Sequence, residues 1–275
     1  MRHIEFKLRA KDGVKLHARR WEPEQEPIGV VCLIHGVGEH SGRYFSMAHH
    51  LAGRGYALLA IDLRGHGKSE GKRGHISNYA ALMDDVTILL NEGSRSYPQR
   101  PFFLYGQSMG GNLVINHALR RHPLLRGVIA SSPMLRTVFE PPSWKKLLAR
   151  YIGRLLPAMP LTNEVKARDL SRDEEIIRKY KTDPLVHDRL TLRFYKVLQA
   201  GTWAIEHAAE LSMPMLIMHG DSDRITSLQA SRTFAERAGD SCTLKVWEGY
   251  YHEVHNEPGK EQVLDYVAGW LASRS

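Results

Sequence analysis

The segment 102–113 constrains the fold of this chain more than any other part of the sequence. It starts with a strand-like apolar run at 102–105, passes through the motif Gly-Gln-Ser-Met-Gly at 106–110, and continues at once in a helical pattern. A strand that leads directly into a helix is the repeating unit of sheets whose parallel strands are covered by helices. The glycines let neighbouring chain pass close to the turn, so Ser108 is expected to stand clear of the sheet.

Short apolar or β-branched runs recur along the chain, and helical patterns separate most of them. An Asp-Gly turn at Asp12 joins the first two runs, which indicates an antiparallel hairpin. The later alternation indicates parallel strands with helices on both faces. The sequence therefore predicts an α/β fold with an eight-stranded, mostly parallel sheet. The expected strands are 3–9, 14–21, 29–34, 56–61, 102–106, 127–131, 214–219 and 243–247, and helices are expected at 79–95, 111–121, 227–238 and 259–271.

The segment 133–210 interrupts this alternation because it contains no convincing strand. We expect an all-helical insertion there, a cap on a core formed by residues 1–132 and 211–275. Within the cap, residues 143–156 combine an apolar stripe that begins at a tryptophan with four basic residues and no acidic one. Such a segment is typical of a helix on a membrane surface, and it also fits a cap helix that covers the domain below.

The composition of the chain limits which classes of ligand and partner the protein is expected to bind. The formal net charge of +8 favours anionic partners, but no basic tract or zinc spacing accompanies it, so no nucleic-acid partner is expected. The fifteen histidines show no ligand spacing, and we expect neither a metal nor a cofactor. Cys32 and Cys242 lie in strand-like runs and are expected to be free thiols. Without a leader-like start or a long apolar run, we expect a cytoplasmic protein. Peripheral contact with a membrane surface is one of the two interpretations left open for residues 143–156.

A serine at such a turn needs a base, and the base needs an acid to orient it. In sheets of this kind, functional residues gather after the carboxyl ends of strands. Asp221 and Asp223 follow one late strand, and His252 and His255 follow the next. We favour Asp223, which stands deeper in its loop, since Asp221 could cap the turn. We favour His252 because it follows its strand more directly. The predicted triad Ser108, Asp223 and His252 has the chain order of the α/β-hydrolases.

Two backbone N–H groups are the candidates for an oxyanion hole. Met109 begins the helix after the serine, where its N–H has no helical partner. The loop after the third strand places Val37 between Gly36 and Gly38, and these glycines let the Val37 N–H turn into the site. Donors of this kind each contribute roughly 3 kcal/mol of transition-state stabilisation.

Four sequence blocks resemble the monoacylglycerol lipase family, a group of α/β-hydrolases that also holds lysophospholipases and is often labelled serine aminopeptidase-like. The resemblance implies cleavage of a monoacylglycerol to fatty acid and glycerol, with the triad and oxyanion hole named above. It also implies that Glu39, Arg43, Tyr180 and His255 line the polar end of the pocket, where glycerol would sit. The blocks are residues 35–44, residues 62–69 with 71–75, residues 106–111, and Asp223-Arg224 with Tyr251-His252; the phrase 180–185 in the cap also matches.

Two departures from the family pattern leave alternatives open. Gln107 stands where a histidine is common before the serine, and the cap is more basic than expected. The alternative activities are those of a lysophospholipase, a general carboxylesterase or an aminopeptidase, for which Glu39 could bind a substrate amine. A non-catalytic binding protein of the same fold is a further alternative, although such a chain would be expected to lose a member of the triad.

Overall fold

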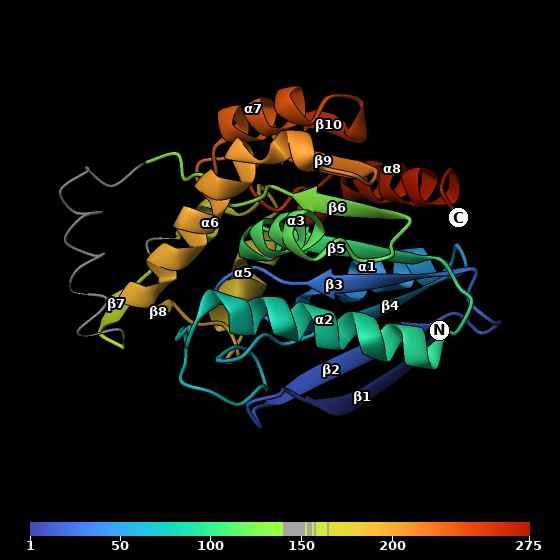
Figure 1. Cartoon of the computed structure of the whole chain (residues 1–275), viewed down its shortest axis with the longest axis horizontal. Helices are drawn as coiled ribbons and strands as arrows, with labels where there is room; N and C mark the ends of the chain where they lie inside the picture. The colour runs from blue at the N-terminus through green and yellow to red at the C-terminus, as the bar shows by residue number, and fades with distance from the viewer. Residues whose placement is uncertain (140–151, 153–155, 157, 164) are drawn as a thin grey trace.

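A computed structural model describes residues 1–139, 152, 156, 158–163 and 165–275. An eight-stranded sheet runs through the molecule in the order β1-β2-β4-β3-β5-β6-β9-β10 (Figure 1). Strand β2 is antiparallel to both of its neighbours, and the other pairs are parallel. The expected eight-stranded, mostly parallel sheet is confirmed. Its strands are β1 (Arg2–Arg9), β2 (Lys15–Glu22), β3 (Gly29–Ile34), β4 (Tyr56–Ile61), β5 (Phe102–Gln107), β6 (Gly127–Ser131), β9 (Met215–Gly220) and β10 (Cys242–Trp247).

Helices cover both faces of the sheet, because successive side chains of each strand point to opposite sides. Cys32 and Ile34 of β3 pack with α2, α3, α6 and α7 on one face. Val31 and Leu33 pack with α1 and α8 on the other. Strand β3 is therefore buried along its whole length. The helices are α1 (Phe45–Ala52), α2 (Tyr79–Ser96), α3 (Met109–Arg121), α5 (Glu174–Thr182), α6 (Tyr195–Glu206), α7 (Leu228–Ala238) and α8 (Lys260–Ala272).

Local side-chain chemistry explains where several elements begin. Asn78 caps α2, because its side chain accepts a hydrogen bond from the N–H of Ala81. Ser227 caps α7 in the same way. Gly13 turns the hairpin between β1 and β2 with a φ of +88°, a conformation that suits glycine. These signals are readable in the sequence, and the helices expected at 79 and 227 begin within one residue of those positions.

The chain between β6 and β9 differs from the all-helical expectation, which was wrong. Two short strands, β7 (Pro160–Thr162) and β8 (Arg189–Thr191), pair antiparallel. Three residues are too few to show the alternation by which a strand is recognised from sequence. Helix α5, β7 and β8 lie beyond the carboxyl ends of the parallel strands (Figure 1).

Helix α6 packs against α3, since Asn116 of α3 donates a hydrogen bond to the carbonyl of Ala200. The proposed membrane-surface helix 143–156 lies outside the described residues, apart from 152 and 156. Within the described part of the chain, no helix is both long enough and apolar enough to cross a membrane.

Candidate active site

Ser108 occupies the sharp turn between β5 and α3. Its φ of 54° and ψ of −112° lie outside the regions that non-glycine residues normally adopt. The backbone holds it there: its N–H donates to the carbonyl of Ser131 at 2.9 Å, and its carbonyl accepts from the N–H of Met134 at 2.9 Å. A Cβ on Gly106 would collide with the carbonyl of Gly110. Strain of this kind costs about 1–3 kcal/mol, and it persists where the surrounding structure fixes it.

A buried carboxylate and an imidazole meet beyond β9 and β10. Asp223 Oδ2 lies 2.8 Å from His252 Nδ1, and both side chains are almost completely buried. The other oxygen of Asp223 accepts the backbone N–H groups of Ile225 and Thr226 at 2.7 and 3.1 Å. Asp221 is exposed and instead accepts the N–H of Gly249 at 2.7 Å. The structure thus brings Asp223, and not Asp221, to His252.

The electrostatics of this pair suit a proton acceptor. Burial would raise the pKa of Asp223, but the adjacent His252 and the hydrogen bonds to His219 and His252 outweigh it and hold that pKa far below its usual range. Burial would likewise lower the pKa of His252, and the Asp223 carboxylate outweighs this effect, so the pKa of His252 is raised. The carboxylate therefore stabilises the imidazolium that forms when His252 takes up a proton.

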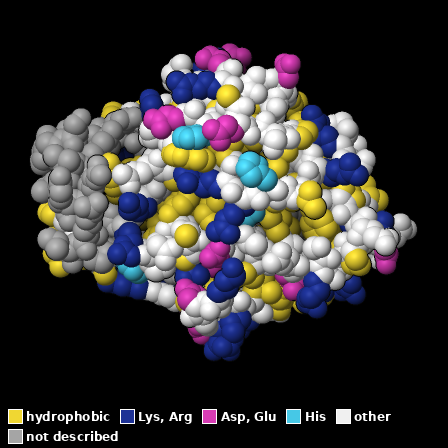
Figure 2. All heavy atoms as spheres, viewed as in Figure 1, with side chains coloured by type: hydrophobic (Ala, Val, Ile, Leu, Met, Phe, Trp, Pro, Cys, Tyr) yellow, Lys and Arg dark blue, Asp and Glu magenta, His cyan; other side chains and the backbone are white. Residues whose placement is uncertain are grey.

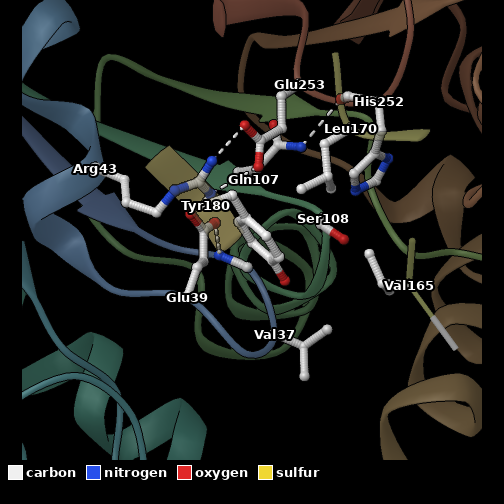
Figure 3. A pocket seen from close by; sticks show the side chains of 11 residues that line it. Val37, Glu39, Arg43, Gln107, Ser108, Val165, Leu170, Tyr180, His252 and Glu253 are labelled. Atoms are coloured by element: carbon white, nitrogen blue, oxygen red, sulfur yellow. Dashed lines mark hydrogen bonds and ion pairs between the residues drawn. The ribbon is translucent and has the colours of Figure 1, made fainter. Parts of the chain in front are cut away.

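Ser108 and His252 line one cavity, and Figure 3 shows both side chains at its wall. His252 Nδ1 is occupied by Asp223, which leaves Nε2 as the nitrogen that can face a nucleophile. Within the described residues, the hydroxyl of Ser108 makes no hydrogen bond. Long catalytic contacts are common in enzymes without bound substrate and tighten on binding.

The raised pKa of His252 has a measurable consequence. A base must be neutral to accept a proton, so kcat/KM should fall about tenfold per pH unit below that pKa. We expect the acidic limb of the pH profile to have its midpoint above 6.5, the usual value for histidine. The measurement is kcat/KM for a neutral ester between pH 5 and 9. A midpoint clearly below 6.5 would contradict the assignment.

Two unpaired backbone donors lie near the serine. Among the described residues, the N–H groups of Val37 and Met109 have no acceptor. Glu39 fixes the loop that carries Val37, because its Oε1 accepts the N–H of Gly36 at 2.6 Å. The same oxygen accepts the hydroxyl of Tyr44 at 2.8 Å. Both N–H groups predicted for an oxyanion hole are therefore available.

A polar wall forms one side of the cavity. Arg43 lies between two carboxylates: its Nη1 is 2.5 Å from Glu39 Oε2 and 2.7 Å from Glu253 Oε1, and its Nη2 donates to Glu253 Oε2 at 2.7 Å. The guanidinium stacks 4.9 Å from the ring centre of Tyr180. In Figure 3 these groups lie on one side of Ser108, with Val165 on the opposite side. The charged side chains of the cavity are therefore gathered on one side of Ser108.

Three of the four predicted pocket residues, Glu39, Arg43 and Tyr180, line the cavity. His255 does not: it stacks on Tyr44 with ring centres 5.0 Å apart, and it is buried. Burial lowers the pKa of His255 to about 4, so it is neutral at physiological pH.

The sequence motifs indicate no role for Glu253, and they mark Gln107 only as a departure from the family pattern. Glu253 follows His252 directly in the chain, and that adjacency is the signal that could have placed it at the site. Gln107 Nε2 donates to the carbonyl of His252 at 3.1 Å, which ties the histidine loop to the end of β5. Its Oε1 is buried and has no partner in the described part of the chain.

The cavity itself is small, about 20 Å³, which is room for a water molecule. Among the residues that the structure describes, no cluster of histidine, cysteine or carboxylate side chains could hold a metal ion. The lining residues are Gly36, Val37, Glu39, Arg43, Gln107, Ser108, Val165, Leu170, Tyr180, His252 and Glu253.

The parallel sheet, the strained serine turn and the acid and histidine after later strands define an α/β-hydrolase. A family model described as serine aminopeptidase, S33, matches residues 25–259. The chain therefore belongs to the serine aminopeptidase S33 family, and it is a carboxylic ester hydrolase. The resemblance read from the sequence motifs is confirmed.

The similarity to known proteins covers nearly the whole chain. The chain is 35% identical to a monoacylglycerol lipase of Mycolicibacterium smegmatis over 264 residues, which are 95% of this chain and 94% of that protein. The crystal structure of a monoacylglycerol lipase from Paleococcus ferrophilus matches with a TM-score of 0.87 at 34% identity, covering 94% of this chain and 99% of the other. An uncharacterized abhydrolase domain-containing protein of Dictyostelium discoideum is 34% identical over 97% of this chain, which spans only 29% of that longer protein.

Proposed function

We propose that this protein hydrolyses monoacylglycerols to a fatty acid and glycerol, with Ser108 as nucleophile, His252 as general base and Asp223 as the orienting acid. The observation that carries the proposal is the buried pair of Asp223 and His252 in the cavity that Ser108 lines. The similarity to monoacylglycerol lipases supports the substrate class.

The reaction follows from this arrangement. His252 Nε2 takes the proton of Ser108 as the hydroxyl oxygen attacks the ester carbonyl, and the N–H groups of Val37 and Met109 stabilise the oxyanion. The C–O bond to glycerol then breaks, and the imidazolium gives its proton to the leaving oxygen. Water, deprotonated by His252, then attacks the acyl-enzyme; the bond between the acyl carbon and the Ser108 oxygen breaks, the imidazolium returns its proton to that oxygen, and the fatty acid is released. Asp223 keeps the imidazole in the tautomer that both steps need.

The substrate would lie across the serine. The wall of Glu39, Arg43 and Tyr180 suits the glycerol end, and the acyl chain would extend beyond the small cavity on the opposite side of Ser108, where Val165 lies. We assign His255 an indirect role, through its contact with Tyr44. Residues 133–210 would act as the cap on a core of residues 1–132 and 211–275, and contact of residues 143–156 with a membrane surface stays a prediction.

A panel of substrates tests the proposal. Purified protein is assayed with monoacylglycerols, diacylglycerols, lysophospholipids and aminoacyl amides, and kcat/KM is compared. We expect monoacylglycerols to have the highest value and the amides a much lower one, because both carboxylates of the cavity are already hydrogen-bonded within the protein. Glu39 accepts from Gly36, Arg43 and Tyr44, and Glu253 accepts from Arg43 and Asn256. Preferential cleavage of the amides or of the lysophospholipids would reject monoacylglycerol as the substrate class.

A further inference from the structure

The polar wall of the cavity carries an excess of negative charge. Among the lining residues that the structure describes, Glu39 and Glu253 are carboxylates, and Arg43 alone has a permanent positive charge. Their side chains are 5%, 3% and 10% exposed, so solvent screens them weakly. Burial would raise the pKa of Glu253, but Arg43 outweighs this and holds it at about 2, so the carboxylate is ionised at neutral pH. One negative charge in this wall is therefore not balanced.

Arg43 is poorly available to an anion from outside. Its Nη1 is shared by Glu39 and Glu253, and its Nη2 is bound to Glu253. One face of the guanidinium lies against Tyr180. To bind Arg43, a phosphate would have to displace the carboxylate of Glu253, which already makes two charge-assisted hydrogen bonds to the guanidinium.

The wall instead offers hydrogen-bond acceptors. Gln107 is 1% exposed, lines the same cavity, and its Oε1 has no partner among the described residues. An unpaired buried acceptor favours a ligand that brings a hydroxyl donor. The outer surface has the opposite character: the net charge is +8, and Figure 2 shows many Lys and Arg side chains dispersed over one face. The negative charge and the hydrogen-bond acceptors of the cavity wall are therefore local features that differ from the positive charge of the whole protein.

We propose that this acidic wall selects esters whose alcohol is an uncharged, hydroxyl-bearing group and excludes esters whose alcohol carries a phosphate monoester, with Glu253 as the residue that determines this specificity. The inference rests on the proposed function, because it concerns the alcohol side of the same ester. A phosphate beside an unbalanced carboxylate in a site of low dielectric is repelled. Contact between like charges weakens the binding of the anion and so favours the uncharged ester.

The test compares three water-soluble short-chain esters that share one acyl group. They are the acylglycerol, its 3-phosphate, and the dimethyl phosphotriester of that phosphate, which keeps the bulk without the charge. For the unaltered protein we expect kcat/KM for the phosphotriester to exceed that for the phosphate by about tenfold or more. In Glu253→Gln, which keeps an oxygen for Arg43, this ratio should shrink at least several-fold.

Glu257→Gln is the matched control. Glu257 is a buried carboxylate on the same loop and is paired with Arg172 at 2.7 Å, but it does not line the cavity. Its substitution should leave the triester-to-phosphate ratio as in the unaltered protein. Melting temperatures of both variants show whether each is folded. If Glu253→Gln fails to fold, the ratio of kcat/KM for phosphotriester to phosphate in the unaltered protein still tests whether the wall excludes the charged ester.

The outcomes separate the two proposals. Cleavage of the acylglycerol with equal values for phosphate and phosphotriester overturns the charge selection and leaves the proposed function standing. A large ratio that Glu253→Gln does not reduce, in a folded variant, overturns the role of Glu253. If the acylglycerol itself is not cleaved, the proposed function fails and the inference fails with it.

Discussion

Replacing Ser108 by alanine should lower kcat for monoacylglycerol hydrolysis by about 10⁵-fold or more, because no other group can form the acyl-enzyme. The fold should survive the change. The hydroxyl makes no hydrogen bond within the described residues, and the backbone bonds to Ser131 and Met134 do not involve the side chain. We therefore expect the melting temperature to change by only a few degrees. Steady-state hydrolysis and thermal unfolding of the purified variant provide the two measurements.

Ser131→Ala is the matched control for this variant. Ser131 is a buried serine at the end of the neighbouring strand, and it does not line the cavity. It should keep most of the activity and should still be labelled by a fluorophosphonate, which reacts quickly only with an activated serine. Ser108→Ala should not be labelled. Residual activity above about one hundredth of normal in a folded Ser108→Ala would exclude Ser108 as the nucleophile.

The parts of the site that could be predicted from the sequence are those that depend on local chain geometry. The turn at Ser108 is encoded by five consecutive residues. The glycines at 106 and 110 indicate that other backbone passes too close for a Cβ at these positions. The acid and the histidine were found because parallel strands bring their carboxyl ends to one edge, so the residues after β9 and β10 had to lie near that edge. The same rule could not choose between Asp221 and Asp223, since both follow β9.

The features that could not be predicted from the sequence depend on contacts between distant segments. Glu253 meets Arg43 across 210 residues of sequence, and no periodicity reports such a pairing. The strands β7 and β8 are three residues each and are defined by each other, so neither carries a signal alone. His255 matched a family pattern but stacks on Tyr44, a contact between segments that are far apart in the sequence.

Glu39 illustrates how the fold changes the interpretation of a motif residue. The resemblance implies contact with glycerol, yet both of its oxygens already accept hydrogen bonds from Gly36, Arg43 and Tyr44. Its firmest role is to hold the loop that presents the N–H of Val37. The residue therefore links the polar wall to the N–H of Val37, a proposed oxyanion donor, and substitutions there should affect kcat as well as KM.

The second large effect is expected at Asp223, the proposed acid of the triad. Asp223→Asn should lower kcat/KM by about 10⁴-fold, because the asparagine would select the wrong histidine tautomer. Its oxygen would stay with the N–H groups of Ile225 and Thr226, which bind Oδ1 of the aspartate. Its amide NH₂ would then face His252 Nδ1 and force the ring proton onto Nε2, where it blocks proton uptake from Ser108.

Asp221→Asn is the matched control, two residues away on the same loop. Asp221 is exposed and accepts a hydrogen bond from the N–H of Gly249, which the asparagine oxygen can also accept. This variant should retain kcat/KM within a few-fold of normal. The loss of the carboxylate in Asp223→Asn should also move the acidic limb of its residual pH profile downward, since that charge is what raises the pKa of His252. A larger loss in Asp221→Asn than in Asp223→Asn would reverse the assignment of the acid.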